Sequence, residues 1–233
     1  MTLADWNKLK SDRFSEYCAA FWELYSADYI SSPYSLRIGG YSGAMFKLKA
    51  AQNVVNGMIE LWAKFYCEYK AEYPRGWGNK WMPYLVFAFR STHLSWSDIA
   101  WYAGDGTCNI NIEPGRETFG QNRVRYWSQH WPLDTYISRP IYSSIINNVN
   151  LYNWNKWRCI FYTNENNELV IKLQVLLGGT WQDICDPIID PENPSGGIVG
   201  FAAYCEFGTS TISPGHNTQM WIDDVKIYRL TPL

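Results

Sequence analysis

The aromatic and arginine residues of this chain have the types and spacing best suited to ligand recognition. Flat Trp and Tyr rings stack on the apolar C–H faces of sugar rings, and polar groups at the ring edges read the hydroxyls. The 233 residues include 13 Trp and 17 Tyr. The candidate ligand-binding residues combine tryptophans of turn-rich segments with one strand that contains Arg and Trp: Trp77, Trp81, Trp96, Trp101, Arg123, Arg125, Trp127, His130 and Trp131. Trp and Tyr are also good strand formers, so part of this set is expected to fill the core or to pair across strands.

The acidic residues do not form the pair that glycan hydrolysis needs. A hydrolase requires an acid and a carboxylate at a fixed separation across one bond. Glu113 and Glu117 are four residues apart in a segment broken by Pro and Gly. Glu60 and Glu68 share a strand face, but eight residues at about 3.4 Å each place them too far apart for one bond. Solvated surface carboxylates are the favoured interpretation, and a protein without catalytic activity is favoured over an enzyme.

Histidine, phosphate-binding and cysteine motifs are equally sparse. His93, His130 and His216 stand in no GxSxG, HExxH or HxH setting. No Gly-rich phosphate loop is complete, so no catalytic residue and no organic cofactor are predicted. None of the six cysteines forms a CxxC, which disfavours zinc. Cys108 and Cys185 lie in turn-like stretches and would pair only in an oxidising compartment.

Charge and hydropathy bear on partners and compartment. The 20 basic residues against 22 acidic ones leave no excess positive field, so nucleic acid is not an expected partner. No apolar run approaches the ~20 residues that a membrane helix needs, so membrane insertion is not expected either. The first ten residues lack the basic-then-apolar order of a secretory signal. The expected location is therefore the cytoplasm or a virion.

Apolar and polar residues alternate with period two along most of the chain. In residues 58–69, Ile59, Leu61, Ala63 and Phe65 share one face. The same alternation occurs in residues 84–90, 169–177 and 197–207. Such one-sided strands are typical of antiparallel sheets that cover a shared core. Frequent turns separate them, and helix signals are few: Thr2 would cap a short helical turn over residues 3–10. The prediction is a single domain over residues 1–233, an all-β, two-sheet antiparallel β-sandwich with little helix.

Four segments resemble a known superfamily. Residues 220–228 (MWIDDVKIY) resemble the closing strand of concanavalin A-like jelly rolls. Residues 155–161 (NKWRCIF) resemble the strand opened by a Trp in the laminin-G-like branch. Residues 196–201 (GGIVGF) resemble its penultimate strand, and residues 31–38 (SSPYSLRI) an early one. The superfamily includes laminin-G-like modules, legume-type lectins and many glucan-active enzymes.

The resemblance implies a concave sheet face often used to hold glycans, and in some members a structural calcium. Oxygen ligands for that ion commonly come from the chain ends and nearby loops, so Asp223 or Asp224, with Asp12, would supply them. Neighbouring strand residues point opposite ways, so at most one of Asp223 and Asp224 faces any given site. The alternative is that one of them bonds a nearby loop backbone or pairs with an Arg.

The resemblance also bears on catalysis. Glucan-active members commonly carry Glu-x-Asp-x-Glu on one strand face, and that pattern is absent here. Polysaccharide lyases with this fold combine Arg, Gln, His and Tyr. Residues 123–130 match that pattern only in part, with Arg123, Arg125, Tyr126, Gln129 and His130.

Three functions remain open at this point. The first is a non-enzymatic module that recognises a polysaccharide or a glycosylated surface through Trp, Tyr and Arg. The second is a structural or assembly protein of a virus or phage, with self-association. The third is a glycan hydrolase or lyase with a non-standard site. The fold does not decide among them, because function belongs to sites.

Overall fold

The computed structural model describes residues 6–10, 21–31, 33–39, 43–48, 53–67, 83–91, 108–113, 122–127, 142–194, 196–205 and 218–231. Over these ranges the chain forms fifteen β-strands and no helix, which confirms the all-β prediction. The strands are β1 (Trp6–Lys10), β2 (Phe21–Tyr25), β3 (Ser35–Gly39), β4 (Gly43–Leu48), β5 (Gly57–Cys67), β6 (Pro83–Ser91), β7 (Cys108–Glu113), β8 (Asn122–Trp127), β9 (Tyr142–Ile146), β10 (Asn155–Thr163), β11 (Leu169–Leu177), β12 (Thr180–Asp183), β13 (Ile188–Asp190), β14 (Ile198–Cys205) and β15 (Thr218–Arg229).

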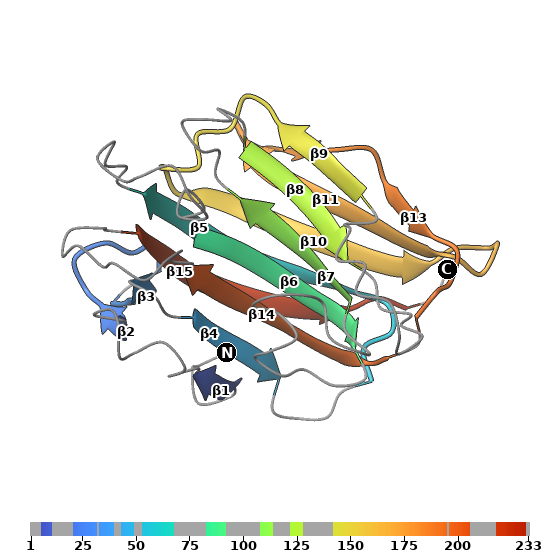
Figure 1. The fold of residues 1–233 in the computed structure, drawn as a ribbon, viewed down its shortest axis with the longest axis horizontal. Helices are drawn as coiled ribbons and strands as arrows, with labels where there is room; N and C mark the ends of the chain where they lie inside the picture. The colour runs from blue at the N-terminus through green and yellow to red at the C-terminus, as the bar shows by residue number, and fades with distance from the viewer. Residues whose placement is uncertain are drawn as a thin grey trace, which may run out of the picture.

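The strands form two antiparallel sheets that stack face to face (Figure 1). Sheet A has the order β1-β4-β14-β6-β7-β8-β9. Sheet B has the order β12-β11-β10-β5-β15-β3-β2, and β13 pairs with β11 beside it. Figure 1 looks through both layers, with β6, β7 and β8 of one sheet lying across β5, β10 and β11 of the other. This is the predicted two-sheet sandwich.

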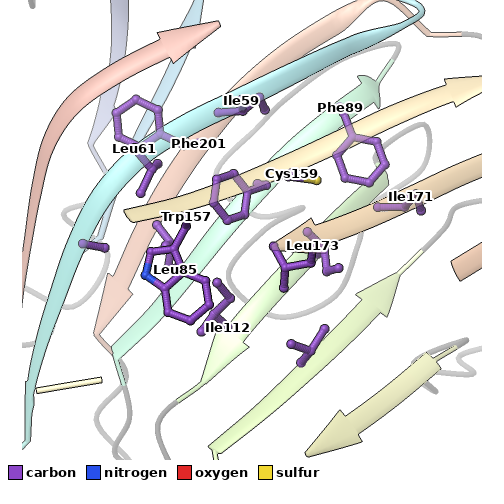
Figure 2. Packing of buried hydrophobic residues seen from close by; sticks show 14 of the residues in the cluster. Ile59, Leu61, Leu85, Phe89, Ile112, Trp157, Cys159, Ile171, Leu173 and Phe201 are labelled. Atoms are coloured by element: carbon purple, nitrogen blue, oxygen red, sulfur yellow. The ribbon is translucent and has the colours of Figure 1, made fainter. Parts of the chain in front are cut away.

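The alternating residues of both sheets meet in one apolar core. Ile59, Leu61, Ala63 and Phe65 of β5 are completely buried, as the period-two pattern predicts. Figure 2 shows side chains from β5, β6, β7, β10, β11 and β14 packed together in this core. Stacked aromatic rings join the two sheets: the ring centroids of Phe89 on β6 and Phe161 on β10 lie 5.0 Å apart. Burial of apolar side chains from two facing layers is the main stabilising term of such a sandwich.

A polar contact also joins the sheets inside the core. The Tyr126 hydroxyl on β8 donates to Asp190 Oδ2 on β13 at 2.8 Å, and both side chains are buried. The second carboxylate oxygen of Asp190 accepts from the backbone N–H of Glu192 at 3.0 Å. Because a buried polar group is costly unless hydrogen-bonded, this pair fixes β13 against sheet A.

Arg90, at the end of β6, is a second buried polar centre. It has a left-handed φ of 47°, and its side chain is almost fully buried. Its guanidinium donates to acceptors from three other segments: the carbonyl oxygen of Val55 (2.6 Å from Nε), that of Pro194 (3.1 Å from Nη1), Asn193 Oδ1, Asn56 Oδ1 (3.0 Å from Nη2) and Thr163 Oγ1 (2.6 Å from Nη2). All five N–H donors of the side chain are thereby used. Burial is the main cause that lowers the pKa of Arg90 from its ordinary value.

The structure corrects the helical turn predicted over residues 3–10. Trp6–Lys10 form strand β1, whose backbone pairs with β4 from Trp6↔Leu48 to Lys10↔Ala44. A single helical turn satisfies few of its own N–H and C=O groups, so pairing with an existing strand outweighs a local capping signal.

Within the described ranges no helix is long and apolar enough to span a membrane. Cys108, Cys159 and Cys185 are in the thiol form.

Candidate functional site

The outward face of sheet A holds two of the predicted ligand-binding residues, Arg123 and Arg125. On β8, Val124 and Tyr126 are buried in the core, while Arg123 and Arg125 alternate with them and are half-buried. On β7, Ile110 and Ile112 are buried and the intervening Asn111 is half-buried. The alternation therefore turns the guanidinium groups away from the core, as the strand interpretation of this segment requires.

Strand register aligns these residues in one cross-strand row. Val86 of β6 pairs with Asn111 of β7, which pairs with Arg125 of β8. Arg123 lies two residues before Arg125, about 7 Å along the strand. Two cationic groups and an amide thus share neighbouring positions on one sheet face, which is a suitable arrangement for hydrogen bonding to hydroxyl or anionic groups.

The Asn111 side chain carries a buried hydrogen-bond acceptor. Among the residues that the structure describes, its Oδ1 atom has no hydrogen-bond partner. Buried carbonyl oxygens are normally paired, and leaving one unpaired costs about 1–3 kcal/mol. A ligand hydroxyl or a water molecule placed there would donate to Asn111 and remove that cost.

The middle of the same face is lined by small residues. Val86 and Ala88 of β6 lie outside the core cluster, yet both are buried. Ala88 pairs with Gly200 of β14, so two residues with minimal side chains stand side by side next to the row. The face is therefore shielded from solvent at β6 and half-open at Arg123 and Arg125 of β8.

The remaining predicted ligand-binding residues divide into two groups. Trp127 closes β8, and its backbone pairs with Asn109 of β7. The others lie outside the described residues: Trp77, Trp81, Trp96, Trp101, His130 and Trp131. Within the described chain the structure thus places Arg123, Arg125 and Trp127 at alternate positions of one strand, next to an asparagine that the sequence interpretation missed. The signal for Asn111 was present in the alternation of Asn and Ile in residues 109–112.

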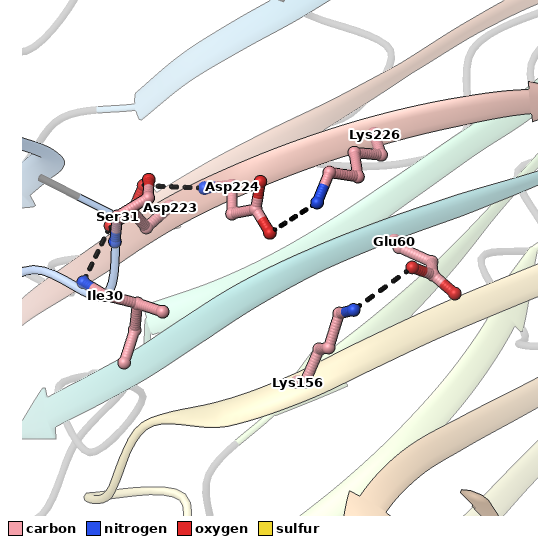
Figure 3. A network of polar contacts seen from close by, with 7 residues as sticks. All are labelled: Ile30, Ser31, Glu60, Lys156, Asp223, Asp224 and Lys226. Carbon is pink, nitrogen blue, oxygen red and sulfur yellow. Dashed lines mark hydrogen bonds and ion pairs between the residues drawn. The ribbon is translucent and has the colours of Figure 1, made fainter.

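Asp223 makes the loop contacts that one of the two interpretations predicted for this pair (Figure 3). Its Oδ2 accepts from the backbone N–H groups of Ile30 at 2.8 Å and Ser31 at 2.7 Å. Its Oδ1 accepts from the Ser31 hydroxyl at 2.5 Å and from the N–H of Asp224 at 2.6 Å. Asp223 is almost fully buried and holds the segment after β2 on sheet B. The carboxylate charge is thus offset by four donors.

Asp224 stands at a bulge of β15. The pairing register with β5 shifts between Asp223 and Lys226, and Asp224 has φ of 46°, a conformation that Asp tolerates better than most residues. Its Oδ2 pairs with Lys226 Nζ at 2.8 Å (Figure 3).

The third predicted calcium ligand, Asp12, lies outside the described residues. In the described part of the chain no three His, Cys, Asp or Glu side chains gather as a metal-ligand group. The calcium site stays a prediction, which a rise in melting temperature on adding the ion would support.

Comparison with known proteins gives matches at the level of structure. No protein-family model matches the sequence, and no characterised protein matches it in sequence. A legume lectin-like domain from Entamoeba histolytica superposes with a TM-score of 0.54 at 12% identity, over 93% of this chain and 92% of that one. The carbohydrate recognition domain of Emp46p in its potassium-bound form gives 0.54 at 10% identity, over 95% and 92%. An endo-β-1,4-glucuronan lyase from the fungus Trichoderma reesei gives 0.52 at 12% identity, over 91% and 88%.

Proposed function

We propose that this chain, which has the concanavalin A-like lectin and glucanase fold, is a non-enzymatic module that binds carbohydrate on the outward face of sheet A. The observation that carries the proposal is the cross-strand pairing of Asn111 with Arg125 on this face, where the buried amide oxygen of Asn111 has no hydrogen-bond partner among the described residues. Sugar hydroxyls both donate and accept hydrogen bonds, so one hydroxyl can donate to the amide oxygen while another accepts from an arginine. The expected partner is a polysaccharide or a glycosylated surface.

Two of the similar structures support this proposal by their own description. One is a legume lectin-like domain, and another is a carbohydrate recognition domain. Trp127, on the same strand as Arg123 and Arg125, is proposed to provide an aromatic surface for a sugar ring. We propose that residues 1–233 act as one module in this role.

The test is a glycan array probed with the purified full chain and with two variants, Arg125→Gln and Asn111→Ala. A lost hydrogen bond to a charged donor costs about 1.5–3 kcal/mol, so we expect Arg125→Gln to weaken binding at least roughly tenfold. Asn111→Ala removes a neutral acceptor, and we expect a loss of roughly twofold to tenfold. Lys226→Gln, which removes one charge from the outer face of sheet B, serves as the control and should bind like the wild type.

A second pair of variants tests the aromatic part of the proposal. Trp127→Ala and Trp77→Ala should each reduce binding to the same glycans, because stacking area is lost. If no glycan binds, or if all four variants bind like the wild type while remaining folded, the proposal is wrong.

A lyase is the second candidate, and the similarity to a glucuronan lyase is the observation in its favour. Tyr126, the tyrosine of the partial lyase pattern, argues against it. Its hydroxyl is buried in the core and donates to Asp190, so it does not reach the outward face where Arg125 lies. We therefore expect no unsaturated product, followed by its ultraviolet absorbance, when the chain is incubated with polyglucuronate. Release of that product would favour the enzyme instead.

A further inference from the structure

The outer face of sheet B carries a row of basic and aromatic side chains on β10, β11 and β12. On β10, Trp157, Cys159 and Phe161 point into the core, and the residues between them are half-buried. The outward residues of interest, which we call the basic–aromatic stripe, are Lys156, Arg158, Tyr162, Lys172 and Trp181. This face is opposite the candidate site on sheet A, because the core lies between the two.

Cations lie over the aromatic rings of the stripe. The Arg158 Cζ atom is 4.2 Å from the centroid of the Trp181 ring, and the Lys156 Nζ atom is 5.7 Å from it. At the other end, Lys172 Nζ is 6.0 Å from the Tyr162 ring centroid. Cation–π contacts of this kind hold both the ring and the cation in defined positions.

Hydrogen bonds fix the arginine further. Arg158 Nε donates to Gln174 Oε1, and Gln174 Nε2 donates to Asp183 Oδ1 at 2.6 Å. Trp181 and Asp183 both belong to β12, so this chain of contacts joins three strands across the surface. A ligand would therefore meet a pre-ordered surface and lose little further side-chain entropy on binding.

The spacing along the strands is regular. Arg158 follows Lys156 by two residues, and Lys172 pairs with Ile160, two residues further along. Three cations therefore recur about every 7 Å along the strand direction. Trp181, which pairs with Leu176 next to Lys156, stands at one end, and Tyr162 stands at the other.

Charge on this surface differs from that of the whole chain. Lys156 pairs with Glu60, whose Oε2 lies 3.3 Å from its Nζ (Figure 3). Arg158 and Lys172 form no ion pair with a carboxylate in the described part of the chain, and Asp183 is joined to Arg158 through Gln174. Among these five groups, three cations stand against two acids, in a protein whose formal charge is −2.

We propose that the basic–aromatic stripe binds a carboxylated polysaccharide. Such a polymer offers a carboxylate on successive sugar rings, which suits cations repeated along a strand, and it offers C–H ring faces to Trp181 and Tyr162. Nucleic acid fits less well, because interfaces with it are much more positively charged than a surface on which two acids accompany three cations. The proposal does not depend on the function of the sheet A face.

The test is calorimetric titration of the full chain with polygalacturonate. Because two solvent-screened cations are lost together, the double variant Arg158→Gln/Lys172→Gln should bind roughly tenfold more weakly. Trp181→Ala should also weaken binding, and raising the salt concentration should weaken the wild type. Lys226→Gln, on the same sheet but paired with Asp224, should bind like the wild type.

Three further arms decide the occupant, with thermal melting used to confirm that each variant is folded. Neutral dextran should not bind, and a single-stranded oligonucleotide should bind much more weakly than polygalacturonate. In sedimentation of the chain without polysaccharide, the wild type and the double variant should show the same association state, because the stripe does not join two copies. The proposal is overturned if polygalacturonate does not bind or if folded stripe variants bind it like the wild type. It is also overturned if Arg125→Gln alone removes binding, if dextran or the oligonucleotide binds as tightly, or if the stripe instead holds two copies together.

Discussion

Replacing Arg90 with leucine tests whether the buried guanidinium holds the loops of one end of the sandwich. The substitution leaves two backbone carbonyl oxygens, those of Val55 and Pro194, without their donor. A buried unsatisfied acceptor costs about 1–3 kcal/mol, and the two together cost about 2–6 kcal/mol. The three side-chain acceptors lose less, since Asn56 Oδ1 also accepts from Thr163 N at 2.9 Å. The leucine side chain avoids the cost of burying a charge, so we expect a net loss of about 3 kcal/mol in the free energy of unfolding.

The assay is urea denaturation followed by tryptophan fluorescence, with Arg90→Lys as the matched variant. Lysine keeps the charge, but it has three donors in place of five and lacks the planar fork, so it should lose stability as well. Both replacements keep an L residue at φ 47°, so backbone strain cancels in the comparison. If Arg90→Leu unfolds within about 0.5 kcal/mol of the wild type, the guanidinium does not organise these loops and the reasoning fails.

Three other perturbations follow from single contacts. Asp223→Ala should lower the free energy of unfolding by about 2 kcal/mol in chemical denaturation, because two loop N–H groups lose their acceptor, whereas Asp224→Asn should change it by less than about 0.5 kcal/mol. Tyr126→Phe leaves one oxygen of the buried Asp190 without its donor, and we expect a drop in melting temperature corresponding to about 2 kcal/mol. Burial raises the pKa of Asp28. The hydrogen bonds that its carboxylate accepts from Lys64 and Trp154 outweigh the effect of burial, so the pKa lies below its ordinary value. A lowered folded-state pKa stabilises the fold above the unfolded-state value and loses that contribution as pH falls through the folded-state pKa. The stability of Asp28→Asn should therefore vary less with pH below about pH 4 than that of the wild type.

The architecture could be predicted because burial imposes period two on the sequence. Residues such as Phe87 and Phe201 are inside because their strands have one apolar face, and alternation alone identifies that face. Strand order could not be predicted in this way. The central position of β15, between β5 and β3, depends on backbone pairing between residues far apart in the chain, and side-chain patterns do not encode partners.

The strand positions of the candidate site could be predicted only in part, because sequence patterns report local alternation and not contacts between strands. Arg123 and Arg125 were expected at alternate positions of one strand, and that is where they lie. Asn111 was missed because it becomes a neighbour of Arg125, 14 residues away in the chain, only when β7 pairs with β8. The basic–aromatic stripe was missed for the same reason: Arg158 and Trp181 come from strands separated by β11 and meet only when the sheet forms.

The two outer faces can carry different chemistry because the core contacts do not constrain them. Tyr126–Asp190 and the Arg90 centre use inward or end-of-strand positions, and Arg125 and Arg158 occupy the opposite parity on their strands. An outward substitution on β8 or β10 thus changes a surface while the buried neighbours on either side keep their packing. The same alternation that makes the fold predictable separates stability from recognition on these two strands. Outward variants of Arg125 and Arg158 should therefore change ligand binding with little effect on the free energy of unfolding, and inward variants on β8 and β10 should do the reverse.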